Sequence, residues 1–473
     1  MIKISVIRTF QTYISGRQTF DKIDLKKNIA ENYTIISILV GYVLVAFSLG
    51  PYHNGDTAWE YDAVLGVMKY GLPYANGLYL MDQPPLGFYI QAAFFKGFGL
   101  SINNGTFLVT LFGLGCVVLV YAIGKIMYNK ITGFFAASLF AFSPWHLLLS
   151  RTFLIDVPCL FFSLLSLYVG IIAVRKNSFK LFFVSGLIFA AAFVTKLYAV
   201  YILIPLLAFL FYYRPRNVKR TVSWLAAFSL PVILISYFWY QTITGIGMTS
   251  IFFHPDFMVH EASSVVPSYF FAGNFIVNYG LGWFFIDAAV LSLIICFAQR
   301  RLFQKFITSD SLCLVVIVCV LGVNTFLGAS LDLKSPYLNS IKYDYQSLPF
   351  LSFLAASLIT KSISLFNIDK AKKKVKKIAY FFVATTGFIL VAATIIYKMS
   401  YVHLFTTWNY FLFRVEPNLN LGYSLFTDTP IGVNSLSMGA QYLGYAFLLS
   451  GLVWTSRKKI GSIFKIIQQK IKS

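Results

Sequence analysis

The sequence has little charge for its length. Of its 473 residues, only 12% are Asp, Glu, Lys or Arg, whereas 58% are hydrophobic and 18% are aromatic. Soluble domains carry about 25% charged residues, because they must cover their surface with polar groups. The shortage excludes a soluble globular enzyme, and the apolar excess excludes a disordered or fibrous chain. The sequence therefore predicts a polytopic membrane protein.

Negative charge is scarcer than positive charge: 17 acidic residues stand against 39 basic ones, for a formal net charge of +22. A basic chain can bind nucleic acid or carry cytoplasmic loops that follow the positive-inside rule. Here the basic residues gather in short gaps between apolar runs, at 125–130, 175–180, 214–220, 300–305, 370–377 and 457–472. This distribution excludes nucleic acid as a partner and predicts membrane lipids around the chain.

Cysteine is also rare, and its few positions all fall inside apolar runs: Cys116, Cys159, Cys296, Cys313 and Cys319. A disulfide framework or a CxxC metal site needs paired ligands in polar loops. Neither kind of site is expected, and these cysteines are interpreted as small apolar residues within the membrane.

Long apolar runs are plentiful. A helix needs about 20 mostly apolar residues to cross a bilayer, or about 17 at the short end. Candidate runs lie at 33–51, 106–124, 132–150, 156–173, 180–195, 197–213, 222–240, 279–297, 312–329, 345–362, 378–397 and 437–454. A shorter run at 85–99 begins at the Pro84-Pro85 pair and is expected to be a partial, tilted or re-entrant helix.

The basic clusters fix the direction of threading. If the run at 85–99 makes no full crossing, every basic cluster falls on one side, which the positive-inside rule identifies as cytoplasmic. We expect an all-α integral membrane bundle of about 12–13 transmembrane helices, with amphipathic helices in the first outer loop. The protein would be a multi-pass protein of the cell (plasma) membrane with both termini cytoplasmic.

Most acidic residues then fall on the extracytoplasmic segments 52–84, 151–155, 241–278, 330–344 and 398–436. Loops longer than about 12 residues are commonly functional. We therefore expect the chemistry on the extracytoplasmic face.

Two carboxylates stand out on that face. Asp56 follows Gly55 directly before an amphipathic stretch, where a carboxylate can cap a helix or face a substrate. Asp156 lies at the mouth of an apolar run, and a carboxylate entering a membrane marks a function or an internal partner. Arg151, five residues earlier, is one such partner. Glu60 lies in the same loop as Asp56 and is a candidate for contact with an acceptor.

Cations accompany these carboxylates. Lys196 lies in the sequence FVTKLYAV between two spans, where it can extend to the interface or bind an anionic lipid phosphate. Lys342, with Tyr343 and Tyr345, precedes another span, where cation and hydroxyl groups suit a phosphate headgroup or form part of an aromatic belt.

The third outer loop contains His254, Asp256, His260 and Glu261. Histidine and carboxylate at this density suit a divalent metal ion, although the spacing matches no strong zinc pattern. A solvated loop is the alternative, and no cofactor is assigned with certainty.

The ordered set of a first-loop Asp, PPLGFYIQAAFFKGFG, SPWHLLLSRTFLIDVPCLFF and FVTKLYAV resembles the C-type (GT-C) membrane glycosyltransferases. Its nearest branch is that of the protein O-mannosyltransferases and lipid A aminoarabinose transferases. The resemblance spans 33–365 and implies a catalytic transmembrane module there. Residues 1–32 would form a basic, amphipathic cytoplasmic segment. Residues 366–473 would supply further helices, an outer loop and a basic tail.

The resemblance implies roles for several residues. Asp56 matches the base that activates the acceptor, and Asp156 matches the second Asp of the family. Lys196 is implied to contact phosphate, and Lys342 with Tyr343 resembles the family's late basic-aromatic element. On chemical grounds, Arg151 and Lys342 are further candidates to lie near the phosphate. Pro84 and Pro85 match a PPL element.

Two positions depart from the family. Thr57 stands where the family commonly has Glu. Gln83, preceded by Asp82, stands where the lipid A branch has a Lys that contacts donor phosphate.

Together these features predict a glycosyltransferase that takes a sugar from a polyprenyl-phosphate donor. The acceptor would be a protein, lipid or glycan, and transfer would be inverting with an Asp base. Twelve spans also suit a transporter or lipid-linked sugar flippase, although such proteins usually carry internal repeats and midplane polar residues. A non-catalytic scaffold subunit is the third interpretation.

Overall fold

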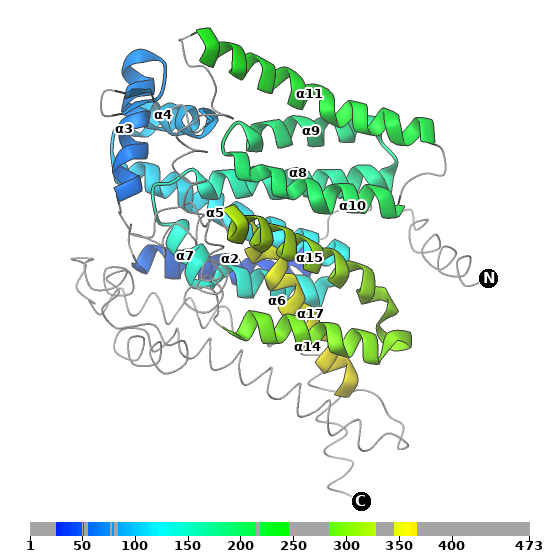
Figure 1. The fold of residues 1–473 in the computed structure, drawn as a ribbon. Coiled ribbons are helices and arrows are strands. Elements are labelled where there is room, and N and C mark those ends of the chain that lie inside the picture. The colour runs from blue at the N-terminus through cyan, green and yellow to red at the C-terminus, as the bar shows by residue number, and fades with distance from the viewer. Residues whose placement is uncertain are drawn as a thin grey trace, which may run out of the picture.

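A computed structural model of the chain describes residues 25–49, 51, 55–75, 78–79, 84–213, 218–245, 283–327 and 345–366. The predicted spans at 378–397 and 437–454 lie outside these residues, as do most of the segments 1–32 and 366–473. The described helices, drawn in Figure 1, are α2 (Leu25–Leu49), α3 (Gly55–Tyr70), α4 (Leu86–Phe98), α5 (Ile102–Met127), α6 (Lys130–Ala141), α7 (Pro144–Leu149), α8 (Asp156–Lys176), α9 (Phe179–Phe193), α10 (Leu203–Tyr213), α11 (Val218–Gly245), α14 (Trp283–Ala298), α15 (Arg300–Leu327) and α17 (Leu348–Phe366).

The remaining described elements are short. Two 3-10 helices, η1 (Leu197–Ile202) and η4 (Tyr345–Ser347), lead into α10 and α17. A small antiparallel pair, β1 (Tyr74–Ala75) and β2 (Leu78–Tyr79), lies in the first loop, with Tyr74 opposite Tyr79. Apart from this pair the described fold is a helical bundle, as the apolar runs predict.

Several described helices have the length and composition of membrane spans: Ile102–Met127, Asp156–Lys176, Val218–Trp239 and Tyr345–Ser364. Shorter apolar helices cover Ile35–Phe47, Lys130–Ala141, Phe179–Phe193, Leu197–Leu210 and Phe306–Gly322. Each coincides with a predicted run. The all-α membrane fold is therefore confirmed for the described part of the chain.

Some predicted boundaries were wrong. The run 132–150 is not one helix, because α6 ends at Ala141 and α7 starts at Pro144 after Ser143. Proline lacks the N–H that a continuing helix requires, so it starts a new helix here. The helix that holds the first apolar run is longer than that run, because α2 starts at Leu25, whereas its apolar part is Ile35–Phe47. The run 85–99 does form a helix, and the 13 residues of α4 are too few to cross a bilayer alone.

The helices pack in two connected groups. Helix α8 contacts α9, α10 and α5, and α9 also contacts α11; α6 joins α5 to α17, which contacts α14 and α15. Figure 1 shows the first group side by side, with α3 and α4 together at one end of the bundle. Glycine allows some helices to approach closely. A Cβ atom at Gly186 would clash with the backbone of Phe228, so this glycine lets the backbones of α9 and α11 approach closely.

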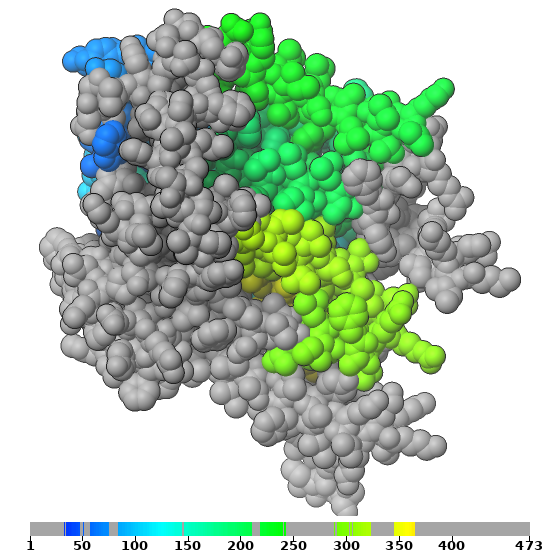
Figure 2. Space-filling view, in the orientation of Figure 1, coloured from blue at the N-terminus to red at the C-terminus, as the bar shows by residue number. Residues whose placement is uncertain are grey.

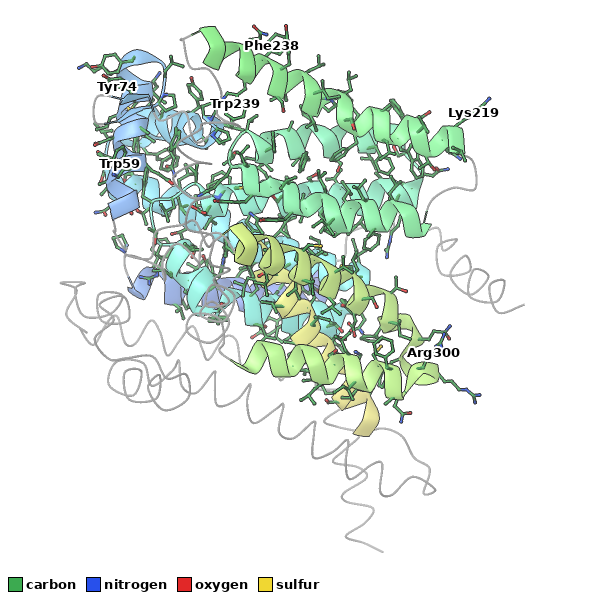
Figure 3. All side chains as sticks on the ribbon, viewed as in Figure 1. Trp59, Tyr74, Lys219, Phe238, Trp239 and Arg300 are labelled. Carbon is green, nitrogen blue, oxygen red and sulfur yellow. The ribbon has the colours of Figure 1, made fainter. Side chains whose placement is uncertain are left out.

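The two ends of the bundle differ in composition. Figure 3 shows Trp59 and Tyr74 at the end that carries α3, and Lys219 and Arg300 at the opposite side. We call these the α3 end and the Arg300 end.

Along the flank, helix α11 exposes large apolar side chains, as do residues of α15, and both helices contribute to the face in Figure 2. The exposed side chains include Leu230, Ile233, Leu234, Tyr237, Phe238, Leu314, Val315 and Val318. Large apolar side chains exposed along a helix suit contact with lipid.

Candidate active site

The centre of the candidate site is an ion pair between Asp156 and Lys196. Asp156 is the first residue of α8, and Lys196 directly precedes η1. The Lys196 Nζ atom donates to both carboxylate oxygens at 2.8 Å, and only 5% and 2% of the two side chains are exposed. Sequence reasoning selected both residues but did not pair them. Both lie at junctions between irregular backbone and helix, where an extended chain can deliver a side chain to a helix start.

Arg151 lies close to this pair in sequence but is bonded elsewhere. Its Nε atom donates to the Leu147 carbonyl oxygen at 2.8 Å, and the side chain is buried. The carboxylate of Asp156 is bound by Lys196 from 40 residues away. The sequence suggested a local partner for Asp156, whereas the structure pairs it with a lysine far away in the sequence.

Two contacts from the first loop hold the residues that flank the ion pair. The Glu60 Oε2 atom accepts a hydrogen bond from the Ile155 amide at 2.9 Å. The Leu86 amide donates to the Val194 carbonyl oxygen at 2.9 Å. A Cβ atom on Gly87 would lie 2.5 Å from Ile155 Cγ2 and 3.3 Å from Thr195 Cγ2. Helices α3 and α4 therefore contact the residues immediately before Asp156 and Lys196.

The PPL element has a structural role in this contact. Pro84 is buried, and Pro85 directly precedes α4 with φ −85°. Because proline has no N–H and a fixed φ, it suits the start of a helix. The Leu86 amide is then the first backbone donor of the segment, and it donates to the Val194 carbonyl oxygen next to the ion pair.

The turn after α3 is fastened to α4. Gly71 directly follows α3 and has φ +79°, in the left-handed region that favours glycine. The Tyr89 hydroxyl of α4 donates to the Gly71 carbonyl oxygen at 2.7 Å, and partial burial raises the pKa of this phenol. Helices α3 and α4 of the first loop therefore form one unit.

Further polar side chains lie close to the ion pair. The Cys159 thiol contacts the Lys196 carbonyl oxygen at 3.5 Å, and Gln346 Nε2 donates to Cys159 Sγ at 3.7 Å. Next to it, the hydroxyl of Tyr345 and Nδ1 of His146 lie 2.6 Å apart. These contacts join η4 to α7 and α8. Sequence reasoning missed His146 and Gln346, because each is a single polar residue in an apolar stretch.

Tyr345 is fully buried and bonded to His146. Tyr345 therefore lies inside the protein, on an element that contacts α8, the helix that begins with Asp156. The other predicted members of its element, Lys342 and Tyr343, lie outside the described residues.

Asp56 occupies the second position of α3, one helical turn before Glu60. Its side chain is outside the description. Thr57, at the position where the family commonly has Glu, is buried. Asp82, Gln83 and the metal candidates His254, Asp256, His260 and Glu261 lie outside the described residues, so the metal site stays a prediction. Among the described residues, no group of three His, Cys, Asp or Glu side chains is arranged to hold a metal ion.

A second buried ion pair, between Asp310 of α15 and Lys361 of α17, was not predicted. Lys361 Nζ donates to the carbonyl and hydroxyl oxygens of Ser292 at 2.8 Å each and to Asp310 Oδ2. The Tyr128 hydroxyl donates to Asp310 Oδ1 at 2.9 Å, and both charged side chains are fully buried. The available signal was an acid and a lysine at the ends of apolar runs, the same signal that identified Asp156.

The α3 end brings together the charged residues of the candidate site. It places an ammonium and a carboxylate at the start of α8, next to the α3–α4 unit, which carries a further carboxylate residue, Asp56.

Comparison with known proteins adds independent information on this region. Residues 82–240 match the family model for dolichyl-phosphate-mannose-protein mannosyltransferases. The protein "Putative mannosyltransferase YkcB" of Bacillus subtilis (strain 168) is 28% identical over 139 residues, which are 29% of this chain and 19% of that relative. The matched family region contains Asp156, Lys196 and the PPL element.

The structure resembles ArnT from Cupriavidus metallidurans. The likeness to ArnT bound to undecaprenyl phosphate has a TM-score of 0.51 at 14% identity, covering 90% of this chain and 77% of ArnT. Against apo ArnT the TM-score is also 0.51, at 15% identity, with 90% and 78% covered. At this identity the likeness concerns the fold. The resemblance seen in the sequence is confirmed to this extent: the chain shares the fold of ArnT, and residues 82–240 match the mannosyltransferase family model.

Proposed function

We propose that this protein transfers a sugar from a polyprenyl-phosphate-linked donor to a protein, lipid or glycan acceptor at the extracytoplasmic membrane face. The observation that carries the proposal is the buried Asp156–Lys196 pair, which α3 and α4 hold from the first loop. The pair lies within the region that matches the mannosyltransferase family. Undecaprenyl phosphate bound to a protein of the same fold supports the class of donor.

In the proposed reaction, Asp56 accepts the proton of an acceptor hydroxyl. The acceptor oxygen then attacks the anomeric carbon from the face opposite the phosphate, and the bond between this carbon and the phosphate oxygen breaks. The polyprenyl phosphate leaves with the electron pair, so the anomeric configuration inverts. A positioned base contributes about 10²–10⁴-fold to such a step.

The leaving phosphate needs positive charge and hydrogen-bond donors. Lys196, held in place by Asp156, is the proposed central cation, with Arg151 from the preceding turn and Lys342 and Tyr343 from the late loop. Charge stabilisation of this kind is worth about 10²–10³-fold per donor. In this proposal Tyr345, which is bonded to His146, has a structural role next to the site.

The direct test is transfer from radiolabelled polyprenyl-phosphate mannose, glucose and aminoarabinose by purified protein in nanodiscs. Asp56→Asn should abolish transfer, whereas the matched control Asp62→Asn, on the same helix, should retain it. Wild-type turnover by a folded Asp56→Asn protein would remove Asp56 as the base. Absence of transfer to membrane lipid, glycan and protein acceptors by the wild type would remove the proposed function.

A lipid-linked sugar flippase is the alternative, and one observation favours it. The Asp310–Lys361 pair is fully buried among membrane helices, and ionisable residues in such positions often belong to transport pathways. Movement of a fluorescent lipid-linked sugar across proteoliposomes, without any transfer, would establish this alternative over the transferase.

A further inference from the structure

Glu60 is an acidic residue of the first loop that is buried although its helix lies at the surface. Only 8% of the residue is exposed, and its Oε2 atom accepts a hydrogen bond from the Ile155 amide, 95 residues away in sequence. A hydrogen bond from an amide to a carboxylate is about twice as strong as one between neutral groups. The contact is thus a specific attachment of α3 to the residue that precedes Asp156.

This hydrogen bond lies at the start of a helix. Ile155 is the residue directly before α8, where the backbone N–H groups of the helix start are concentrated. The partial positive charge at a helix N-terminus stabilises an anion. Glu60 therefore completes the start of α8 from a different helix, and it does so beside the carboxylate of Asp156.

Apolar contacts keep α3 in place independently of this bond. Ala63, Val64 and Val67 pack in one cluster with Phe88 and Phe95 of α4, and with residues before α8. The Tyr61 ring lies 5.8 Å from that of Phe153 and 5.9 Å from that of Phe95. Removal of the Glu60 carboxylate would thus change the local position of the helix start without detaching α3.

The spacing along α3 connects Glu60 to the proposed base. Asp56 precedes Glu60 by four residues, which is about one helical turn of 5.4 Å. The hydrogen bond of Glu60 therefore fixes the first turn of α3, where Asp56 lies, relative to the residue before Asp156. We propose that Glu60 is a positioning residue that sets the distance between Asp56 and the Asp156–Lys196 pair. This inference rests on the proposed function and assigns Glu60 a role other than contact with the acceptor.

The test combines a structural and a kinetic measurement on the full-length protein in nanodiscs. Glu60→Ala should raise deuterium uptake in the peptide covering residues 150–158, because the Ile155 amide loses its acceptor. The same variant should lower kcat about 10–100-fold per folded molecule, since small displacements of reacting groups cost up to about 10²-fold. The KM for the donor should stay within about two-fold, because kcat alone reports a misplaced base.

Two variants provide matched controls. Glu60→Gln retains an acceptor oxygen and should recover most of both losses. Asp62→Ala removes an acid two residues away on α3 and should change neither uptake nor kcat. A general loss of stability would lower the folded fraction without changing kcat per folded molecule.

The outcomes separate this inference from the proposed function. Unchanged uptake in Glu60→Ala, or raised uptake with unchanged kcat, would overturn the positioning role while transfer by the wild type stands. A raised donor or acceptor KM at constant kcat would overturn it in favour of direct substrate contact. If the wild type transfers no sugar, the proposed function fails, and the positioning role fails with it.

Discussion

The described part of the chain contains two buried Asp–Lys pairs, and their surroundings differ. At the α3 end, Lys196 donates to both oxygens of one carboxylate, and both residues lie at junctions of helix and irregular backbone. In the second pair, Lys361 divides its bonds between Asp310 and the two oxygens of Ser292, and Asp310 also binds Tyr128. The first pair is supported by a loop unit, whereas the second joins α5, α14, α15 and α17.

This difference separates two uses of the same residue types. A lysine whose three N–H groups are used by protein acceptors has no donor left for a substrate, so the Asp310–Lys361 pair is suited to fixing helix positions. A pair at the start of a helix, beside a surface loop, is suited to meeting a ligand. The following predictions test this comparison, in order of the expected effect.

The largest effect is expected from breaking the pair at the α3 end. Lys196→Met should reduce sugar transfer by about 10²–10³-fold, because the leaving phosphate loses its proposed cation. The loss should appear in kcat per folded molecule, measured with labelled donor in nanodiscs. Lys69→Met, which changes an exposed lysine of α3, is the control and should behave as wild type. Equal activity of Lys196→Met and the wild type would show that the Asp156–Lys196 pair, like the Asp310–Lys361 pair, is not needed for transfer.

Breaking the second pair should mainly reduce stability. Lys361→Met leaves the Asp310 carboxylate buried without its partner, and such changes cost about 3–5 kcal/mol. Thermal unfolding in detergent should show a clearly lower Tm, while kcat per folded molecule should stay within about two-fold. A selective loss of transfer at unchanged Tm would contradict the structural role of this pair.

Double variants separate a structural role of each pair from a chemical one. Replacement of a whole buried ion pair by apolar residues is often neutral or stabilising. Asp310→Leu combined with Lys361→Met should therefore recover much of the Tm lost in the single variant. Asp156→Leu combined with Lys196→Met should recover Tm at most and leave transfer as low as in Lys196→Met. Recovery of transfer in the latter double variant would exclude a chemical role for the pair.

A smaller effect is expected at Tyr345. Tyr345→Phe removes the bond to His146, which is worth about 1 kcal/mol, and should lower Tm slightly and transfer a few-fold at most. An increase of ten-fold or more in donor KM would instead indicate that the hydroxyl binds the donor phosphate. His146→Gln is the companion variant, because it retains a hydrogen-bonding group near the phenol.

Local pattern was sufficient to predict much of this molecule. Apolar runs located the described helices, and the cost of a membrane carboxylate identified Asp156. The break between α6 and α7 was missed because hydropathy continues through Ser143 and Pro144, although proline was the available signal. The pairing of Asp156 with Lys196 depends on how α3, α4, α8 and η1 pack, and spacing along the chain contains no such information.

The second pair shows the same limit more clearly. Lys361 follows an apolar run and precedes a strongly basic stretch, so its position in the sequence suggests a cytoplasmic loop. The structure instead includes it in α17, with a side chain that is fully buried. Its role follows from Asp310 and Ser292, which are 51 and 69 residues away.

The burial of the thiols has a practical consequence for membrane topology. Cys116, Cys159, Cys296 and Cys313 are buried and Cys319 is half-buried, so the natural chain should react slowly with maleimides that cannot cross a membrane. A cysteine introduced at the exposed Trp59 or at the exposed Lys219 would then be the dominant reactive group. These two positions lie at opposite sides of the bundle (Figure 3). Labelling of intact cells would therefore reveal which end of the protein faces outward, without any knowledge of its substrate.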